Sequence, residues 1–524
     1  MLEISVGEAL RKAFQSYRNS VAFEVDGVAY TYQSVQQTVN RLANGLLELG
    51  LRKGDRIVIM TTNRMEYVFT DLAAAILGLV KVPLNVMLNN KDIDYRIRDS
   101  EARAVVLDDF FVKKTNLFFR TYDFLERIIY VPERGQGLPP GVINFNELIE
   151  KSLASDPGIK VEPNDPLAIM YTGGTTGEPK GVVHTDKSCL SIFFNIIVTH
   201  EINSEDEVML LTAPLPHATG FFIPSGLFRG ARIIITRGFN LEEFFKLVEE
   251  KRVTWTFTVP TMIYAMVDHP ARTRHDLSSL RTLIYGGAPI LPRRLEEALL
   301  AMGPIFLQGY SQMEVSCNTT MFTKRQHMDA LKSSDKKKLQ SCGLPMLMAQ
   351  VKIVREDGNE VGVGEIGEII TRGPHMMAGY WRKEEETRET IVDGWIHTGD
   401  LATVDEDGYI YVVDRKKDMI ITGGLNVYSK EVEDALARHP DVSEVVVIGT
   451  PDQKWGEQVM AIVVRKQGSH VTEQTLIDYC KEQVSAYKVP KRVEFRESLP
   501  KTPYGKYDKK AVRGEYWKGY ERQI

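Results

Sequence analysis

The apolar residues recur along the chain with two different spacings, which predict alternating helices and strands. One face of a helix is indicated by apolar residues four and three positions apart: Val35, Val39, Leu42, Leu46 and Leu49. Gly50 is well placed to end this helix, because glycine tolerates the left-handed conformation found after many helices. A short strand is expected before the helix, over Tyr30–Tyr32, and a buried strand after it, over Asp55–Met60.

The same alternation continues through roughly the first two thirds of the chain. We expect a helix over residues 72–80 and strands over residues 104–107, 233–235, 255–258 and 283–285. Strands separated by helical segments favour parallel sheets that are covered by helices on both faces.

Beyond about residue 350 the pattern changes to short alternating strands with glycine turns, as in residues 364–370. This change indicates a smaller β-rich subdomain, and the C-terminal part then returns to a mixture of helices and strands. We therefore predict a large N-terminal α/β domain of parallel-rich sheets with a β-rich subdomain, followed by a small α+β domain.

The composition agrees with a large globular protein. A chain of 524 residues is too long for one hydrophobic core, so at least two domains are expected. The formal net charge of −5 gives no electrostatic footprint for nucleic acid. The basic run Lys336–Lys338 is short, and we expect a solvated loop there.

The cysteines and the apolar stretches indicate a protein of a reducing compartment. The four cysteines form no C-x-x-C pair, which indicates neither a zinc site nor a disulfide framework and fits the cytoplasm. The N-terminus lacks a basic region followed by an apolar core, so no signal peptide is expected. The longest apolar stretch, Leu72–Val80, is too short to span a bilayer.

The segment Tyr171–Gly181 concentrates the candidate chemistry. Its sequence is Tyr-Thr-Gly-Gly-Thr-Thr-Gly-Glu-Pro-Lys-Gly. Glycines let the backbone approach a ligand closely, threonine hydroxyls and backbone N–H groups donate to phosphate oxygens, and the lysine adds a cation. The segment is not a Walker A loop, because Lys180 is followed by Gly181 rather than by Ser or Thr. From composition alone, a polyphosphate-binding loop and a flexible surface loop are equally supported.

This segment resembles the signature loop of the adenylate-forming superfamily, which comprises acyl-CoA synthetases, luciferases and the adenylation domains of peptide synthetases. Further segments resemble other motifs of that family, in the family's order, over nearly the whole chain. The resemblance implies that a carboxylate attacks the α-phosphate of ATP to give an acyl-adenylate and pyrophosphate. A thiol, expected to be coenzyme A, then takes the acyl group.

The resemblance also assigns the parts of ATP. The β- and γ-phosphates would be held by the glycine-rich loop through Thr172, Gly173, Gly174, Thr175, Thr176 and Lys180. Adenine would lie against the backbone of Gly286, Gly287, Ala288 and Pro289, next to Gly309 and Tyr310. Tyr310 is expected to stack on the purine, and a tyrosine of the core is the alternative.

The ribose is assigned to the motif Asp393–Asp400. Asp400 would accept hydrogen bonds from both ribose hydroxyls, and Arg415 resembles an arginine that reaches the ribose or the phosphate. Outside this motif, an aspartate after glycine is usually a cap or a turn residue.

Glu314 resembles the glutamate that holds Mg²⁺ against the phosphates, together with Thr176. The family pattern is close to Tyr-Gly-x-Thr-Glu, whereas this chain has Tyr310-Ser-Gln-Met-Glu314. Ser311 replaces the usual glycine, and Met313 replaces a threonine that contacts the α-phosphate. A thioether cannot donate a hydrogen bond, so that contact is either absent or made by Ser311 or Gln312. For Glu314 alone, a solvated surface carboxylate is the alternative.

The C-terminal part carries the last predicted site residues. Lys506 ends the motif Pro500-Lys-Thr-Pro-Tyr-Gly-Lys506 and resembles the lysine that meets the carboxylate and the α-phosphate; the alternative is an ordinary surface lysine. The segment Asp414–Met419 is so charged that a packed interior is not expected, and Lys417 there resembles the hinge of a mobile C-terminal domain. The pair Gly423 and Gly424 resembles the loop that lines the pantetheine tunnel.

This resemblance divides the chain into residues 1–414, with the β-rich subdomain from about residue 350, and residues 415–524, with a hinge at 415–418. Rotation about Lys417 would exchange Lys506 for Gly423 and Gly424 between the two half-reactions. Homodimers occur in the family, but no segment indicates an interface.

The acid is indicated least clearly. His217 resembles a residue that forms one wall of the acyl pocket and gates the carboxylate, with Phe221 and Phe222 beside it; a core histidine is the alternative. Gly220 and Gly309 are expected to leave space. Such a pocket suits a fatty, alicyclic or aromatic acid. An amino acid is disfavoured, because no aspartate stands in this motif to pair with an α-amine.

Two alternatives remain open. The adenylate could be passed to a carrier protein, or oxidised as in luciferase, rather than transferred to coenzyme A. The departure at Met313 also leaves room for a catalytically silent protein that binds ATP or acyl-AMP. The joint presence of Lys180, Glu314, Asp400, Arg415 and Lys506 favours an active ligase.

Overall fold

The computed structural model describes residues 4–133, 135, 137–172, 178–317, 319–502 and 506–518. The chain divides into two compact units. The first contains the described residues up to Thr172 together with Pro179–Gln350 and Arg372–Ile396. The second contains Glu178, Val351–Thr371 and the described residues from His397 onward.

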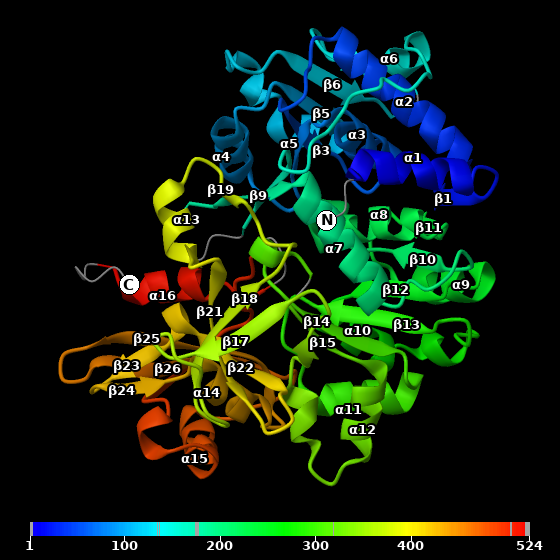
Figure 1. Ribbon diagram of the computed structural model, residues 1–524. Coiled ribbons are helices and arrows are strands. Elements are labelled where there is room, and N and C mark those ends of the chain that lie inside the picture. The colour runs from blue at the N-terminus through cyan, green and yellow to red at the C-terminus, as the bar shows by residue number, and fades with distance from the viewer. Residues whose placement is uncertain are drawn as a thin grey trace. The chain divides into compact units, whose positions relative to one another are not determined.

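The first unit contains two large sheets of mainly parallel strands (Figure 1). One has the order β19-β9-β8-β4-β3-β5-β6-β7, formed by β3 (Arg56–Met60), β4 (Val80–Pro83), β5 (Ala104–Asp108), β6 (Arg127–Val131), β7 (Ile143–Asn144), β8 (Pro166–Tyr171), β9 (Gly181–Thr185) and β19 (Gly379–Tyr380). Strands β8 and β9, and β9 and β19, pair antiparallel, whereas strands β3 to β8 are joined by parallel pairs.

The second large sheet has the order β16-β15-β14-β13-β12-β10-β11-β1-β2. Its strands are β1 (Val21–Val25), β2 (Val28–Thr31), β10 (Val208–Leu211), β11 (Arg232–Ile235), β12 (Trp255–Thr258), β13 (Thr282–Gly286), β14 (Phe306–Tyr310), β15 (Thr320–Phe322) and β16 (Leu344–Pro345). The strands β1, β11, β10, β12, β13 and β14 run parallel, so their carboxyl ends all lie on the same side of the sheet. Open α/β sheets bind ligands beyond the carboxyl ends of their strands.

Helices separate these strands, as the sequence predicts. The helices of the first unit are α1 (Val6–Ser16), α2 (Tyr32–Glu48), α3 (Met65–Leu77), α4 (Asn90–Ser100), α5 (Asp109–Thr115), α6 (Phe145–Lys151), α7 (Asp186–Thr199), α8 (Gly220–Phe228), α9 (Leu241–Lys251), α10 (Pro260–Asp268), α11 (Pro292–Met302), α12 (Lys324–Lys332) and α13 (Glu384–Thr390). In the described part of the chain, no helix is long and apolar enough to cross a membrane.

One predicted helix is displaced. The sequence favoured residues 72–80, but α3 begins at Met65 and ends at Leu77, and Val80 already belongs to β4. Gly78 ends the helix in the left-handed conformation, with φ of 65°. All but one residue of α3 are buried. The helix therefore has no polar face, and the spacing of apolar residues does not show where it begins. A smaller shift affects Tyr32, which begins α2 rather than ending a strand.

The second unit contains two smaller sheets, each of five strands. The first comprises β17 (Gln350–Val354), β18 (Gly367–Arg372), β20 (Ile391–Val392), β21 (Trp395–Val404) and β22 (Ile410–Arg415). Of these, β20 belongs to the first unit by its residues, and β17, β18 and β21 each have one or two terminal residues there. The second comprises β23 (Ile420–Thr422), β24 (Leu425–Val427), β25 (Val442–Asp452), β26 (Gly456–Arg465) and β27 (Arg492–Phe495). Its helices are α14 (Ser429–Ala437), α15 (Glu473–Gln483) and α16 (Lys509–Tyr516).

Strand alternation explains how this last sheet is covered. Val445 and Val447 pack in a core with residues of α14 and α15, whereas Val446 and Ile448 pack on the other face with Val512 of α16. The C-terminal sheet is therefore buried on both faces, and the predicted α+β character is confirmed.

Candidate active site

The two ends of the glycine-rich loop meet at the base of a β-hairpin. Thr172 N donates to the Lys180 carbonyl oxygen at 3.0 Å, and Lys180 N lies 3.4 Å from Thr172 Oγ1. Tyr171 and Gly181 are paired in β8 and β9, so the strand pair fixes where the loop leaves and returns. The predicted phosphate ligands Gly173, Gly174, Thr175 and Thr176 lie outside the described residues.

Lys180 and Glu314 are both contacted by one side chain that the sequence analysis did not single out, Tyr380. The Tyr380 hydroxyl donates to Glu314 Oε1 at 2.7 Å, and Lys180 Nζ lies 4.9 Å from the centre of the Tyr380 ring. Tyr380 reaches this place because β19 pairs with β9, with Tyr380 opposite Val182. No pattern in the sequence around Tyr380 indicates these contacts, because the residues that Tyr380 meets, Val182 and Glu314, lie far from it along the chain.

The Met313 segment is held by a buried histidine. His184 Nε2 lies 2.9 Å from the Met313 carbonyl oxygen and 3.0 Å from Ser316 Oγ. Burial lowers the pKa of His184 to about 4, so this ring is neutral at physiological pH. Ser316 Oγ is 3.8 Å from the Met313 sulfur. Met313 is the first residue of the short helix Met313–Val315, which also carries Glu314.

The adenine motif lies at the carboxyl end of β13, where the fold expects a ligand. A Cβ on Gly286 would lie 2.5 Å from the Gly309 carbonyl oxygen, so only glycine fits this strand pair. Gly287 has φ of 78°, and Pro289 is exposed. Tyr310 is neither buried nor fully exposed, so its side chain is not part of the core.

Asp400 and Arg415 face each other across two strands. They are paired in β21 and β22, and Arg415 Nε lies 3.3 Å from Asp400 Oδ1. Asp400 is only 4% exposed. It therefore lies in a strand, not in a turn or at a helix cap, and its charge is paired with the arginine predicted to act beside it.

Lys506 belongs to the same compact unit as this pair. Its backbone closes a loop: Thr502 N donates to the Lys506 carbonyl oxygen at 2.7 Å, and Lys506 N donates to Thr502 Oγ1 at 3.3 Å. The residue is exposed to solvent, yet desolvation by nearby protein lowers the pKa of its amine to about 8, and the positive charges of Arg415 and Lys417 act in the same direction. The carboxylate of Asp400 opposes them.

The predicted hinge segment contains a correction. The charge density of Asp414–Met419 argued against a packed interior, but Asp414 is buried, at 5% exposure. Its carboxylate accepts hydrogen bonds from Ser429 Oγ at 2.9 Å and from Arg415 N at 2.8 Å, which compensate its burial. Lys417 follows in a short helical turn, and its carbonyl oxygen accepts a hydrogen bond from Arg513.

Gly423 and Gly424 form the turn between β23 and β24. A Cβ on Gly423 would lie 2.6 Å from the indole ring of Trp455, and Gly423 N donates to the Trp455 carbonyl oxygen at 2.8 Å. Gly424 has φ of 81°, which glycine adopts without strain. The pair is thus required by the turn itself, and its predicted contact with a thiol substrate stays a prediction.

The residues predicted for the acyl pocket lie together but differ in accessibility. His217 is half-buried in an irregular helical turn, whereas Phe221 and Phe222 are buried at 4% and 1% exposure. Gly220 does not leave space as predicted, because an added Cβ would lie 2.6 Å from the Leu215 carbonyl oxygen. Gly309 does leave space: among the described residues that are not its chain neighbours, only His200 Nε2 comes within 4 Å of its added Cβ, at 3.9 Å.

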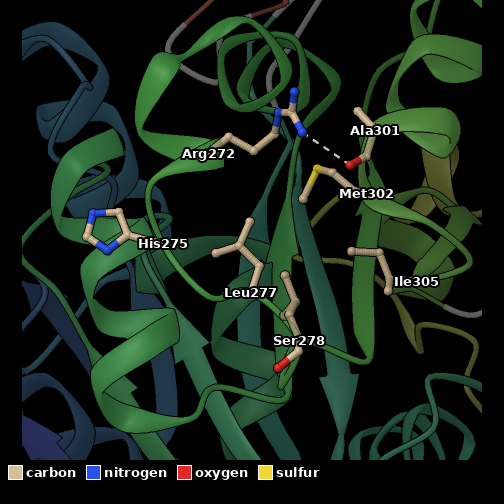
Figure 2. A pocket seen from close by; sticks show the side chains of 8 residues that line it. Arg272, His275, Leu277, Ser278, Ala301, Met302 and Ile305 are labelled. Carbon is tan, nitrogen blue, oxygen red and sulfur yellow. Dashed lines mark hydrogen bonds between the residues drawn. The ribbon is translucent and has the colours of Figure 1, made fainter.

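A separate cavity of about 280 Å³ lies away from these residues (Figure 2). Leu277, Ser278 and Ile305, which line it, precede β13 and β14, so it lies at the amino ends of these strands. Figure 2 shows Arg272 hydrogen-bonded to the Ala301 carbonyl oxygen at its side, at 3.2 Å. The cavity lies at the amino ends of these strands, whereas the adenine motif lies at their carboxyl ends.

Comparison with known proteins identifies the family of the chain. Residues 10–381 match the AMP-binding enzyme family, and residues 431–506 match the AMP-binding enzyme C-terminal domain. A medium/long-chain fatty-acid–CoA ligase of Mycobacterium tuberculosis is 35% identical over 532 residues, which cover 99% of this chain and 91% of the relative. A feruloyl-CoA synthase of Amycolatopsis sp is 37% identical over 505 residues, covering 95% of this chain and 96% of the relative.

A solved structure shows the same fold. The amide bond synthetase McbA from Marinactinospora thermotolerans superposes with a TM-score of 0.87 at 28% sequence identity, covering 98% of this chain and 100% of that protein. The family matches span most of the chain, and the fold class and the predicted resemblance are confirmed. The chain belongs to the adenylate-forming superfamily of AMP-binding enzymes.

Proposed function

We propose that this protein is an ATP-dependent carboxylic acid:CoA ligase that activates an apolar acid. The observation that carries the proposal is the convergence of Lys180 and Glu314 on Tyr380. A cation and a carboxylate from two distant family motifs meet there beside the glycine-rich loop. Two of the relatives are themselves CoA ligases, one for fatty acids and one for ferulate.

In the first half-reaction, an oxygen of the acid's carboxylate forms a bond to the α-phosphorus of ATP. The bond from that phosphorus to the bridging oxygen of the β-phosphate breaks, and pyrophosphate leaves with the electron pair. Negative charge is spread over phosphate oxygens, so fixed cations and donors supply the catalysis. Lys180 would stabilise the leaving phosphates, and Lys506 would stabilise the carboxylate and the α-phosphate. Asp400 and Arg415 would orient the ribose.

The chemistry of Glu314 fits a magnesium ion. Mg²⁺ uses few protein carboxylates together with water and phosphate oxygens, and when bound it neutralises the polyphosphate. Glu314 presents such a carboxylate, which the Tyr380 hydroxyl orients through one of its two oxygens. Thr176 is the second proposed contact.

In the second half-reaction, the thiol sulfur of coenzyme A attacks the carbonyl carbon of the acyl-adenylate. The carbon–oxygen bond to phosphate breaks, AMP leaves, and the thiol proton passes to solvent. We propose that the turn of Gly423 and Gly424 lines the path of the pantetheine arm after the C-terminal domain, residues 415–524, rotates about Lys417. The Arg513 contact to the Lys417 carbonyl would have to persist or re-form in that movement.

The test is pyrophosphate release with ATP and coenzyme A over a panel of fatty, alicyclic, benzoic and cinnamic acids. Release with one class, together with its acyl-CoA thioester, supports the ligase. Release without a thioester moves the acceptor to a carrier protein or an amine, as in the amide bond synthetase. ATP binding without any release would support the silent protein and contradict the proposal.

A further inference from the structure

A histidine that no family motif contains lies at the inner side of the acyl region. His200 follows α7 and is 2% exposed. Its carbonyl oxygen accepts a hydrogen bond from Trp255 Nε1 at 2.8 Å, and its ring lies 5.8 Å from the ring of Phe222. Trp255 begins β12, so the histidine lies toward the amino end of this strand, deep in the first unit.

The hydrogen bonds of His200 fix its tautomer. Burial lowers the pKa of the ring to about 3, so it is neutral and carries one N–H. Nδ1 lies 2.9 Å from Thr199 Oγ1, and the Thr199 hydroxyl donates its single proton to the Asn195 carbonyl oxygen at 2.6 Å. The hydroxyl can therefore only accept from His200, which places the ring proton on Nδ1 and leaves a lone pair on Nε2.

That lone pair has no hydrogen-bond partner within the described residues, and it borders the space that Gly309 leaves. Nε2 is 3.9 Å from the position of an added Gly309 Cβ, and apart from the two chain neighbours of Gly309 no other atom of the described residues comes within 4 Å of that position. The side chain is 2% exposed, and a ligand that brings a donor to this space would satisfy the acceptor. Gly309 directly precedes Tyr310, which places this space beside the proposed adenylate.

The surroundings of the histidine are aromatic. The Phe222 ring centre lies 5.0 Å from those of both Trp255 and Phe257, in tilted and edge-on arrangements. Flat rings pack well in such surroundings. A saturated chain would gain burial there but would leave the His200 acceptor unpaired.

We propose that His200 Nε2 accepts a hydrogen bond from a donor group at the far end of an aromatic acid, so that the preferred substrates are aryl carboxylic acids with a distal hydroxyl. This inference rests on the proposed function, because it names the substrate class of the same acyl site. His200 is a specificity-determining residue that would touch the substrate away from the reacting carboxylate.

Four acids of similar shape test the polarity of the contact: 4-hydroxycinnamate, 4-aminocinnamate, 4-methoxycinnamate and cinnamate. The first two bring a donor, the third only an acceptor, and the last neither. We expect kcat/KM for acyl-CoA formation to be at least about tenfold higher for the two donors, since one buried hydrogen bond is worth about 1–3 kcal/mol. Equal values for all four acids, or a preference for cinnamate or 4-methoxycinnamate, would overturn the proposal while leaving the ligase intact.

Variants of His200 and Thr199 show whether the preference for donors comes from the hydrogen bond to Nε2 or only from the packing of the ring. His200→Phe should remove the preference for donors, whereas Thr199→Val should weaken it by freeing the ring proton to move to Nε2. Thr199→Ser keeps the hydroxyl and is the matched control, with the preference retained. A His200→Phe enzyme that still prefers the hydroxylated acid tenfold would contradict the assignment.

A binding measurement on the wild-type protein keeps the proposal testable if the enzyme does not turn over these acids or if a variant does not fold. Calorimetric titration of the wild-type protein with ATP and each acid should give tighter binding of 4-hydroxycinnamate than of 4-methoxycinnamate. If no acid releases pyrophosphate, the proposed function fails, and this difference in affinity still decides the role of His200. Equal or absent binding of the two acids would refute it.

Discussion

Lys509 on α16 is predicted to hold the C-terminal unit together through two carboxylates. Lys509 Nζ lies 2.7 Å from Glu433 Oε1 and 2.7 Å from Ser429 Oγ, which in turn donates to Asp414. Glu433 also accepts a hydrogen bond from the backbone N–H of Val447 in β25. One ammonium thus links α16, α14 and the end of β22.

The change Lys509→Met removes the charge and keeps most of the volume. Breaking a buried ion pair by removing one partner costs about 3–5 kcal/mol. The side chains of Lys509 and Glu433 keep 20% and 17% exposure, so we expect the lower end, about 3 kcal/mol. That corresponds to amide exchange about 100-fold faster where it proceeds by opening of this unit.

The loss should depend on pH. Burial already raises the pKa of Glu433 and of Asp414 in the folded protein, and removal of the lysine raises both further. An acid with a raised folded pKa costs stability above that pKa, and the cost disappears as the pH falls below the unfolded pKa. The variant should therefore be more destabilised at pH 8 than at pH 5.

Hydrogen exchange of the amides of α14 and β25 measures this loss locally, which suits a chain of two units better than a global melting curve. Lys510→Met is the matched control, because Lys510 is the exposed neighbour on the same helix and should change stability by at most about 0.5 kcal/mol. Equal exchange in the two variants, or a loss that is the same at pH 5 and pH 8, would refute the reasoning.

Four further predictions concern the two half-reactions. Lys506→Ala should slow adenylation by several orders of magnitude and spare thioester formation from supplied acyl-AMP; an equal fall in both would contradict the alternation of domains. Because the pKa of Lys506 is about 8, its ammonium is lost as the pH rises through that value, so adenylation measured by pyrophosphate exchange should decline above about pH 8. An alkaline limb that stays flat to pH 10 would exclude this role. Lys417→Pro should slow thioester formation more than adenylation, since proline restricts the backbone angles that a hinge must change; wild-type rates in both would show that Lys417 is not the pivot. Tyr380→Phe should raise KM for magnesium ATP about tenfold, because Glu314 loses its donor, and an unchanged KM would argue against the role of this hydroxyl.

Residues whose role depends on local pattern were predictable from the sequence. The helix with Val35 and Leu46 on its buried face and the strand Trp255–Thr258 were found because their periods are those of the elements themselves. The start of α3 was missed because burial on all sides removes the polar face that would reveal a period. The expectation for Asp414 was wrong because charge density says nothing of partners such as Ser429, which lies on the next helix.

The site shows the same division. Lys180, Glu314, Asp400 and Lys506 each stand in a recognisable motif, so each could be proposed from the sequence. Tyr380 and His200 could not, because their significance comes from contacts with residues remote in the chain. Tyr380 meets Glu314 through pairing of β19 with β9, and His200 meets the space at Gly309 through the packing of α7 on the sheet. Long-range pairing of this kind leaves no local pattern.

The division of the chain into two compact units places the residues proposed to select the acid in one unit and several residues proposed to bind ATP in the other. The groups that border the proposed acyl space, His200, Phe222 and Gly309, belong to the first unit, whereas Asp400, Arg415 and Lys506 belong to the second. Substitutions that reshape the acid pocket therefore leave the internal packing of the second unit untouched. Under the proposed function, such a layout lets a lineage of enzymes acquire new acids by changing a few side chains of the first unit, while Asp400, Arg415 and Lys506 of the second unit are inherited unaltered.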